Sequence, residues 1–270
     1  MNRDFIAKHW YAYAYEQFET QTHDIEFLLK VLSEEAGDSS LSILEVACGG
    51  GRISIPLAKA GHSVTGFDAD ESMLLRCYRR MQNMSSMTCY QADALDAPWG
   101  KGFDLVILAG NILINIETDQ DYMEAQKIFI NKAFAALRPG GHLYMDYDQH
   151  SYSSAIKFFN HLGESGRLGK DAIYNDELGT SGVIKIYGNV YDPVTRICTW
   201  ASHWDLQTNN GERIIKSTMG HKHIPTLEQV YSWLSNAGFE IEKSWRNYSE
   251  EPLSENEQDF VRATIWARKG

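Results

Sequence analysis

Short apolar runs alternate with helix-like stretches along most of the chain. The runs are rich in apolar and β-branched residues, whereas the stretches between them repeat their apolar residues every three or four positions, as one face of a helix does. The predicted strands are 41–47, 63–68, 87–91, 103–108, 142–146, 239–245 and 260–267. The predicted helices are 4–18, 23–35, 53–60, 71–82, 122–137 and 226–237. Strands that alternate with helices at this spacing predict a mostly parallel sheet with helices on both faces.

The alternation of strand and helix stops between residues 151 and 224. Three segments there alternate apolar with polar residues, as antiparallel strands do, namely 183–191, 197–206 and 212–220. Asp192-Pro193 and Asn209-Asn210-Gly211 supply the turns between them. We therefore predict that residues 151–224 form an inserted antiparallel β cap over the ligand crevice, and that 1–150 and 225–270 form the sheet domain.

The charge and the cysteine content narrow the classes of partner. A formal net charge of -11 repels phosphate backbones and anionic lipids, so it disfavours nucleic acid and membrane partners. The four cysteines form no Cys-x-x-Cys pair and match no zinc-site spacing. We expect reduced thiols, no metal site and a cytoplasmic protein, since the chain also shows neither a signal peptide nor an apolar run of about 18 residues.

Three consecutive glycines, Gly49, Gly50 and Gly51, follow the strand at 41–47 and precede a helix. Glycine lets the backbone turn sharply and lets a ligand approach where a Cβ atom would clash. A dinucleotide-binding fingerprint would require a fourth glycine at the position of Ser54, and the Gly-Lys-Ser/Thr of a nucleotide P-loop is absent. The turn therefore indicates a ligand site, and both phosphate-binding interpretations are disfavoured.

Acidic residues follow the next two strands. Asp68 ends the strand at 63–68, where a carboxylate can accept hydrogen bonds from both hydroxyls of a ribose or can cap the following helix. Asp93 follows the strand at 87–91, where it can accept from an adenine amino group or serve as an ordinary loop acid. The fourth strand ends in small residues and one amide, Ala109-Gly110-Asn111.

These features, in this order and together with the turn at 137–141, resemble the class I S-adenosylmethionine-dependent methyltransferases from about residue 41 to residue 146. The resemblance implies an α/β fold: a Rossmann-like, seven-stranded, mostly parallel sheet whose last strand is antiparallel, with N-terminal helices. It also implies S-adenosyl-L-methionine as cofactor and S-adenosyl-L-homocysteine as product.

The same resemblance assigns the cofactor-binding residues. It places Gly49 and Gly51 on the methionine moiety, Asp68 on the ribose, Ala69 and Met73 beside the adenine, and Asp93 on the adenine amino group. It further places four residues in this site: Glu45, Ala47, Ala94 and Ala109. Glu45 stands where many relatives have Asp. Arg52, directly after the glycines, has no assigned ligand, and a helix-surface salt bridge is its plainest role.

The acceptor half resembles small-molecule N-methyltransferases of the glycine N-methyltransferase type. In that enzyme an arginine shortly after the fifth strand holds the substrate carboxylate, whereas Asp148 occupies the corresponding position here. A carboxylate there favours a cationic or polyhydroxylated amine over a free amino acid. The residues expected to orient or deprotonate the acceptor are Asn111, Asp146, Asp148, His150, His203 and Tyr15. Asp146 could instead cap a turn, and the tyrosine could pack in the core.

Other functions remain open from the sequence. The same cofactor could serve O-methylation, cyclisation or decarboxylation, or could be bound without catalysis. An NAD-dependent oxidoreductase is disfavoured by Ser54, and nucleic acid methylation by the charge and by Ala109-Gly110-Asn111-Ile112 in place of the usual [DNS]PP[YF] tetrapeptide. We therefore expect methyl transfer to a small molecule, most simply an amine nitrogen, by a monomer or homodimer.

Overall fold

The computed structural model describes residues 2–37, 39–82, 84–149, 173–254, 257 and 261–270. The chain divides into two compact units, each built from two separate stretches of sequence. One unit comprises Gln21–His150 and Pro225–Gly270, and the other comprises Met1–Thr20 and Ser151–Ile224. No helix within the described ranges is long and apolar enough to cross a membrane.

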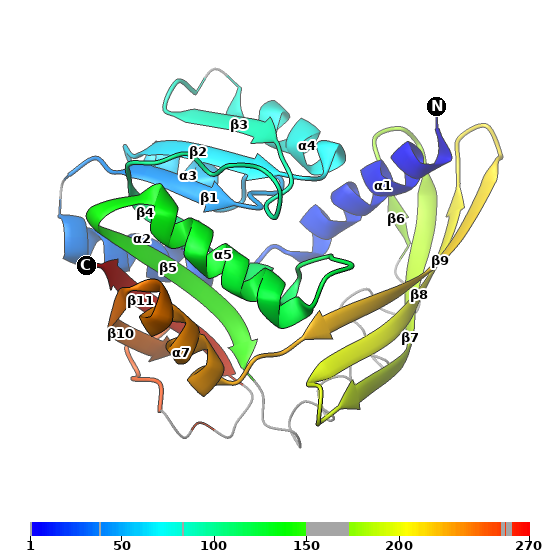
Figure 1. Cartoon of the computed structure of the whole chain (residues 1–270). Helices are drawn as coiled ribbons and strands as arrows, with labels where there is room; N and C mark the ends of the chain where they lie inside the picture. Colours follow the sequence, from blue (N-terminus) through cyan, green and yellow to red (C-terminus); the bar gives the residue numbers. More distant parts are fainter. Residues whose placement is uncertain (1, 38, 83, 150–172, 255–256, 258–260) are drawn as a thin grey trace. The chain divides into compact units, whose positions relative to one another are not determined.

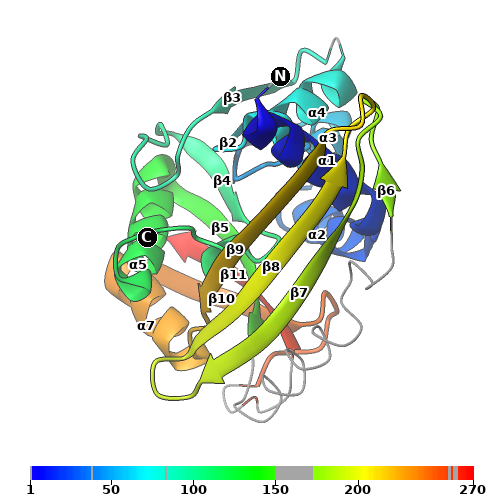
Figure 2. The same cartoon turned by 90° about the vertical axis from the view of Figure 1, so that its right-hand side faces the viewer.

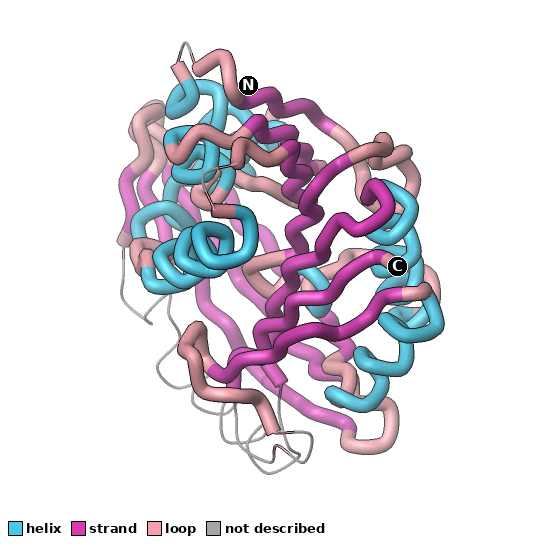
Figure 3. Tube along the Cα trace, turned by 90° about the vertical axis from the view of Figure 1, so that its left-hand side faces the viewer, coloured by secondary structure: helices cyan, strands magenta, loops and turns pink. Residues whose placement is uncertain are grey.

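The larger unit is built on a seven-stranded sheet with the strand order β10-β11-β5-β4-β1-β2-β3. Its strands are among those drawn in magenta in Figure 3. The strands are β1 (Ser42–Val46), β2 (Ser63–Asp68), β3 (Met87–Gln91), β4 (Phe103–Leu108), β5 (Leu137–Gln149), β10 (Phe239–Arg246) and β11 (Val261–Lys269). β3, β2, β1, β4 and β5 pair in parallel, while β11 is antiparallel to both β5 and β10. The predicted fold class, with its antiparallel last strand, is confirmed.

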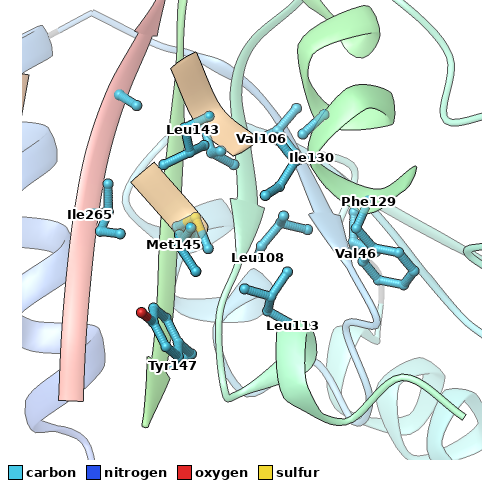
Figure 4. Packing of buried hydrophobic residues seen from close by; sticks show 14 of the residues in the cluster. Val46, Val106, Leu108, Leu113, Phe129, Ile130, Leu143, Met145, Tyr147 and Ile265 are labelled. Atoms are coloured by element: carbon cyan, nitrogen blue, oxygen red, sulfur yellow. The ribbon is translucent and has the colours of Figure 1, made fainter. Parts of the chain in front are cut away.

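Helices cover both faces of this sheet (Figure 1). One face carries α5 (Tyr122–Ala136) and α7 (Leu227–Ala237), and the other carries α2 (His23–Ala36), α3 (Ser54–Lys59) and α4 (Glu71–Met81). Successive strand residues point to opposite faces. Leu143 and Met145 of β5 therefore join the α5 cluster seen in Figure 4, whereas Tyr144 between them joins the α2 cluster.

The ends of the helices agree with the local sequence signals. Thr226 caps α7 in a capping box with Gln229, and Gly238 ends it in the left-handed conformation. Helix α5 ends at Ala136, and the chain enters β5 at once. The predicted strand at 142–146 is thus longer at both ends, because Leu137 already pairs with Phe103 across an irregularity before Leu105 pairs with His142.

The smaller unit consists of α1 (Arg3–Phe18) and a four-stranded antiparallel sheet. Its strands are β6 (Tyr174–Asn175), β7 (Ser181–Asp192), β8 (Ile197–Gln207) and β9 (Arg213–His223), in that order across the sheet (Figure 2). The three long strands and both turns lie where the alternating pattern predicts them.

Helix α1 belongs to the core of this smaller unit, whereas the sequence placed residues 1–20 with the sheet domain. Trp10 is fully buried, donates its Nε1–H to the Tyr174 carbonyl oxygen at 2.9 Å, and packs 6.1 Å from the Trp204 ring. His9 and Asp176 form a buried pair with 3.2 Å between Nδ1 and Oδ2. These contacts join segments far apart in sequence, so helix periodicity gave no sign of them.

Candidate functional site

The predicted cofactor residues gather at the carboxyl ends of the parallel strands, which we call the carboxyl edge of the large sheet. β4, β1, β2 and β3 are parallel neighbours, so their carboxyl ends and the loops that follow lie together at this edge. The chain runs from β1 outward to β2 and β3, and later from β4 outward to β5, so the strand order reverses between β1 and β4. Ligands of open parallel sheets bind at such a point, directly over the glycine turn.

The turn after β1 depends on left-handed backbone. Ala47, Gly49 and Gly51 all have positive φ, at 55°, 53° and 75°. A Cβ atom at Gly51 would lie 2.8 Å from Cys77 Sγ, so this position has no room for any other residue. A Cβ atom at Gly49 or Gly110 would meet nothing within 4 Å, so both backbones face open space. The turn therefore offers bare backbone to a ligand on one side and packs tightly against α4 on the other.

Asp68 joins two of the loops at this edge. Its Oδ2 accepts the Gly49 N–H at 2.9 Å, and its Oδ1 accepts the Asp70 N–H at 2.8 Å. Burial raises the pKa of Asp68 above its ordinary value, and the backbone hydrogen bonds oppose that shift. The carboxylate thus fixes the glycine turn against the end of β2, which is where the resemblance places the ribose.

The remaining predicted adenine-side residues lie on the loops after β2 and β3 and on α4. Asp93 is exposed, and its Oδ1 accepts the Leu95 N–H at 2.8 Å, which leaves its second oxygen available to a ligand. Ala69 is exposed as well, whereas Met73 and Ala94 are half-buried. Ala109 is half-buried at the end of β4. The fold therefore brings the predicted set to one edge of the sheet.

Glu45 lies inside the sheet layer rather than on its surface. It is buried and accepts a hydrogen bond from the Ser54 hydroxyl. Burial raises the pKa of Glu45 to about 8, although the Ser54 hydrogen bond and the charge of Arg52 oppose the shift. Ser54 occupies the position where a dinucleotide-binding fingerprint would need glycine. Its hydroxyl is thus the hydrogen-bond partner of the buried Glu45 carboxyl under the turn.

Arg52 has a structural partner. Its Nη1 and Nη2 atoms bind the two carboxylate oxygens of Asp24 on α2, at 2.9 and 2.5 Å. Such a bidentate pair fixes the geometry of both groups. The pair ties α2 to the residue directly after the glycine turn.

Two buried carboxylates hold the loop after β4. Gly110 and Asn111 both have left-handed backbone, and their N–H groups donate to Asp146 Oδ2 and Oδ1 at 3.2 and 3.1 Å. The Asn111 side chain donates to Asp148 Oδ2 and accepts the Asp148 N–H, each at 2.7 Å. Asp146 and Asp148 thus position Asn111, and Asp146 holds a turn, which was the alternative role that the sequence left open for it.

Arg262 of β11 completes this group, and the sequence gave no indication of it. The antiparallel register sets Arg262 opposite Asp148, and the guanidinium binds Asp146 at 2.9 Å and Asp148 at 2.6 Å. Burial alone would lower the pKa of Arg262, but the charges of Asp146 and Asp148 outweigh it and hold that pKa above its usual range. We call Asn111, Asp146, Asp148 and Arg262 the carboxylate cluster.

Three further residues were predicted on the acceptor side. Tyr15 on α1 and His203 on β8 belong to the smaller unit, where Tyr15 packs on Phe18 and His203 Nδ1 lies 3.0 Å from the Ser217 hydroxyl. His150 lies outside the described residues. Across the part of the chain that is described, no three or more His, Cys, Asp or Glu side chains are placed to hold a metal ion.

Comparison with known proteins agrees with this geometry. Residues 43–141 match the family model of a methyltransferase domain. The chain is 31% identical to the rat (Rattus norvegicus) glycine N-methyltransferase over 120 residues, which is 41% of each chain. The chain therefore spans about two-fifths of that relative's length. It is also 26% identical to a putative methyltransferase, YqeM, of Bacillus subtilis over 228 residues, or 82% of this chain and 83% of that one.

A solved structure extends the likeness to nearly the whole fold. The S-adenosylmethionine-bound amino pentose methyltransferase CalS10 of Micromonospora echinaspora superposes with a TM-score of 0.60 at 15% identity, over 96% of each chain. Residues 43–141 therefore form a methyltransferase domain of the S-adenosylmethionine-dependent kind. Its cofactor is S-adenosylmethionine. The open backbone at Gly49 and Gly110 and the half-buried Asp68 carboxylate of this methyltransferase domain fit that ligand.

The first prediction concerns the room beneath the turn. Gly51→Ala adds a Cβ atom 2.8 Å from Cys77 Sγ, whereas Gly61→Ala adds one at a position that also has positive φ but no neighbour within 4 Å. Both variants carry the backbone strain, so their difference isolates the clash, which we expect to cost about 1–3 kcal/mol. Chemical denaturation should rank the wild type above Gly61→Ala and Gly61→Ala above Gly51→Ala. An equal loss in the two variants would contradict this packing.

The second prediction concerns Glu45, whose pKa rises from 4.5 to about 8 on folding. The folded protein therefore holds this proton more tightly than the unfolded chain, so stability from the proton is complete below about pH 4.5 and is lost as the pH rises through about 8. Glu45→Gln stays neutral and lacks this loss. The free energy of unfolding of both proteins is measured by denaturation at several pH values. As the pH rises, the value for Glu45→Gln should increase relative to that of the wild type, by at most about 1.4 kcal/mol per pKa unit. Parallel pH profiles would disprove the shift.

Proposed function

We propose that this protein transfers the methyl group of S-adenosylmethionine to an amine nitrogen of a small molecule. The observation that carries the nitrogen assignment is the charge of the carboxylate cluster. Asp146 and Asp148 share one guanidinium, so the cluster holds two acidic groups against one cation. It sits at the carboxyl end of β5, beside the loop that follows β4.

An excess of buried negative charge selects the charge of its ligand. Asp146 is 1% exposed and Asp148 is 9% exposed, so water screens them poorly. A carboxylate or phenolate acceptor would meet repulsion here, whereas an ammonium or a neutral amine would not. One oxygen of Asp148 forms the ion pair with Arg262 and the other accepts a hydrogen bond from Asn111. Each oxygen has a further lone pair that can accept a hydrogen bond from a ligand.

The part of the protein's own residues in the reaction is to bind the cofactor and to orient the acceptor. When bound, S-adenosylmethionine supplies an activated methyl group, so the protein's residues need not form a covalent intermediate. Asp68 and the glycine turn hold the nucleoside and methionine parts, and the left-handed Gly110-Asn111 backbone borders the acceptor side. The cluster holds Asn111 in one orientation, which favours a fixed line of approach for the nitrogen. The acceptor enters as an amine that has lost its ammonium proton.

Two further points support an amine. The glycine N-methyltransferase and the amino pentose methyltransferase named above carry nitrogen substrates or amino sugars in their names. The position where a carboxylate-binding arginine is expected from that family holds Asp148, and Arg262 is engaged by the cluster instead. We therefore favour an acceptor that has an amine and lacks a free carboxylate, such as an amino sugar.

The third prediction tests the cofactor site. Asp68→Asn replaces the carboxylate that we assign to the ribose, and loss of charge-assisted hydrogen bonds of about 1.5–3 kcal/mol weakens binding by roughly 10- to 100-fold. Asp104→Asn is the matched control, because Asp104 also accepts a backbone N–H, from Ser42 at 2.7 Å, but at the opposite edge of the sheet. Calorimetry with S-adenosylmethionine, S-adenosylhomocysteine and NAD should show tight binding of the first two only.

Failure of the wild type to bind either adenosyl ligand would overturn the cofactor assignment for this chain. Equal weakening by Asp68→Asn and Asp104→Asn would mean that the loss comes from folding and not from the ribose contact. The free energy of unfolding of both variants, measured alongside, separates these two results.

The fourth prediction tests the acceptor class. A panel of amines, phenols and carboxylates is assayed by S-adenosylhomocysteine release, and we expect turnover of amines alone. Asp148→Asn keeps the shape of the cluster but removes one charge, so kcat/KM for the best amine should fall about tenfold while cofactor affinity stays within a factor of about two. Asp104→Asn should leave both quantities unchanged. Preferred methylation of phenols or carboxylates would overturn the nitrogen assignment and leave methyl transfer itself intact.

A further inference from the structure

Helix α1 packs on one face of the four-stranded sheet in the smaller unit. Ile184, Leu206 and Ile214 of that face join Ile6 and Trp10 of α1 in one buried cluster. Successive strand residues point to opposite faces, so the residues between these positions on β7, β8 and β9 point away from α1. We call the face that they form the outer face. Its apolar residues include Val183, Tyr187, Val190, Ala201, Ile215 and Met219.

Three of these apolar residues lie next to one another across the sheet. Tyr187 pairs with Ala201, and Ala201 pairs with Met219, so one apolar row crosses β7, β8 and β9, which lie side by side in Figure 2. Ile215 lies on β9 two rows further along. Tyr187 is 50% exposed, Ile215 56% and Met219 63%. Apolar side chains gathered in this way are typical of a protein–protein contact, whereas single exposed ones are ordinary.

The polar side chains beside the apolar row pair with one another across the strands. Thr199 Oγ1 lies 3.0 Å from His221 Nδ1 on one side of the row. On the other side, His203 Nδ1 lies 3.0 Å from Ser217 Oγ. Burying a polar group costs free energy unless it is hydrogen-bonded, and these groups already have partners within the sheet. The outer face can therefore be covered without leaving them unpaired.

The charges of the outer face balance, unlike those of the whole chain. Among its described residues, with histidine neutral, Lys185 and Arg213 are the cations and Asp192 and Asp205 are the carboxylates. Arg213 binds both carboxylate oxygens of Asp205, at 2.8 and 2.7 Å. The chain has a formal net charge of -11, so its acidic excess lies elsewhere. Two copies that meet through this face avoid that repulsion, whereas a strongly acidic or basic partner would meet like charges on it.

We propose that the outer face is the contact between two copies of this chain, which pack sheet against sheet about a two-fold axis. Such a contact uses the same surface on both copies, so it needs a face that complements itself. An apolar row with balanced charges meets this condition. Tyrosine, methionine and arginine, which this face carries, are enriched at protein–protein contacts.

The size of the outer face predicts the strength of this dimer. β7 has 12 residues, and β8 and β9 have 11 each. With strands about 4.8 Å apart and a rise of about 3.4 Å per residue, the three strands present roughly 500 Å² of flat area per copy. Two copies then bury about 1,000 Å², which is close to the lower limit for a specific contact. We therefore expect a dimer that dissociates on dilution.

The test compares the full-length wild type with Tyr187→Lys, Met219→Lys and Val194→Lys. Val194 is 89% exposed but lies in the turn between β7 and β8, so its variant adds the same charge outside the outer face. Sedimentation equilibrium gives the dissociation constant of each dimer. We expect a wild-type dimer in the micromolar range and a dissociation constant at least about tenfold higher for Tyr187→Lys and Met219→Lys, because a charge buried in an apolar contact gains no partner. Val194→Lys should keep the wild-type value.

Three results would overturn this dimer. They are a wild type that stays monomeric at every concentration, a dissociation constant unchanged in Tyr187→Lys and Met219→Lys, or an equal rise in Val194→Lys. Circular dichroism and thermal unfolding of dilute samples check that each variant folds, and Tyr187→Ser and Met219→Ser serve where a lysine variant does not. The dimer does not depend on the methyl transfer proposed above, so S-adenosylhomocysteine binding of the same samples tests that function separately.

Discussion

The hydrogen bonds of Asp68 hold the functional edge of the sheet together. One carboxylate oxygen takes the N–H of Gly49 from the turn after β1, and the other takes the N–H of Asp70 at the start of α4. Ala47 in this turn is a non-glycine residue with left-handed backbone, a conformation that persists only where the surroundings fix it. Asp68 supplies that fixation from the neighbouring strand, so the parallel pairing of β1 with β2 is what makes the turn possible.

On the acceptor side, charged side chains hold the loop after β4 in place. Asp146 receives the two N–H groups of the loop after β4, and Asp148 holds the Asn111 side chain. Two carboxylates buried side by side repel each other, and Arg262 is the cation that relieves this repulsion. The antiparallel last strand therefore does more than extend the sheet, because it carries the guanidinium group that fixes the acceptor side.

Cysteine side chains fill the underside of the glycine turn. Gly51 and Gly66 are small where sulfur atoms fill the space beneath them. A well-packed interior transmits a small change in one contact to its neighbours.

The sequence by itself determined the features that depend on neighbouring residues. The alternation of strands and helices, the glycine turn, the acid after each of two strands and the antiparallel meander all follow from local periodicity and turn chemistry. The tertiary structure decided the pairings between distant segments. Strand register set Arg262 against Asp148, side-chain packing brought three cysteines together, and Trp10 drew α1 into the smaller unit. These contacts leave no periodic signal, because each depends on how separate elements pack and not on the sequence around it.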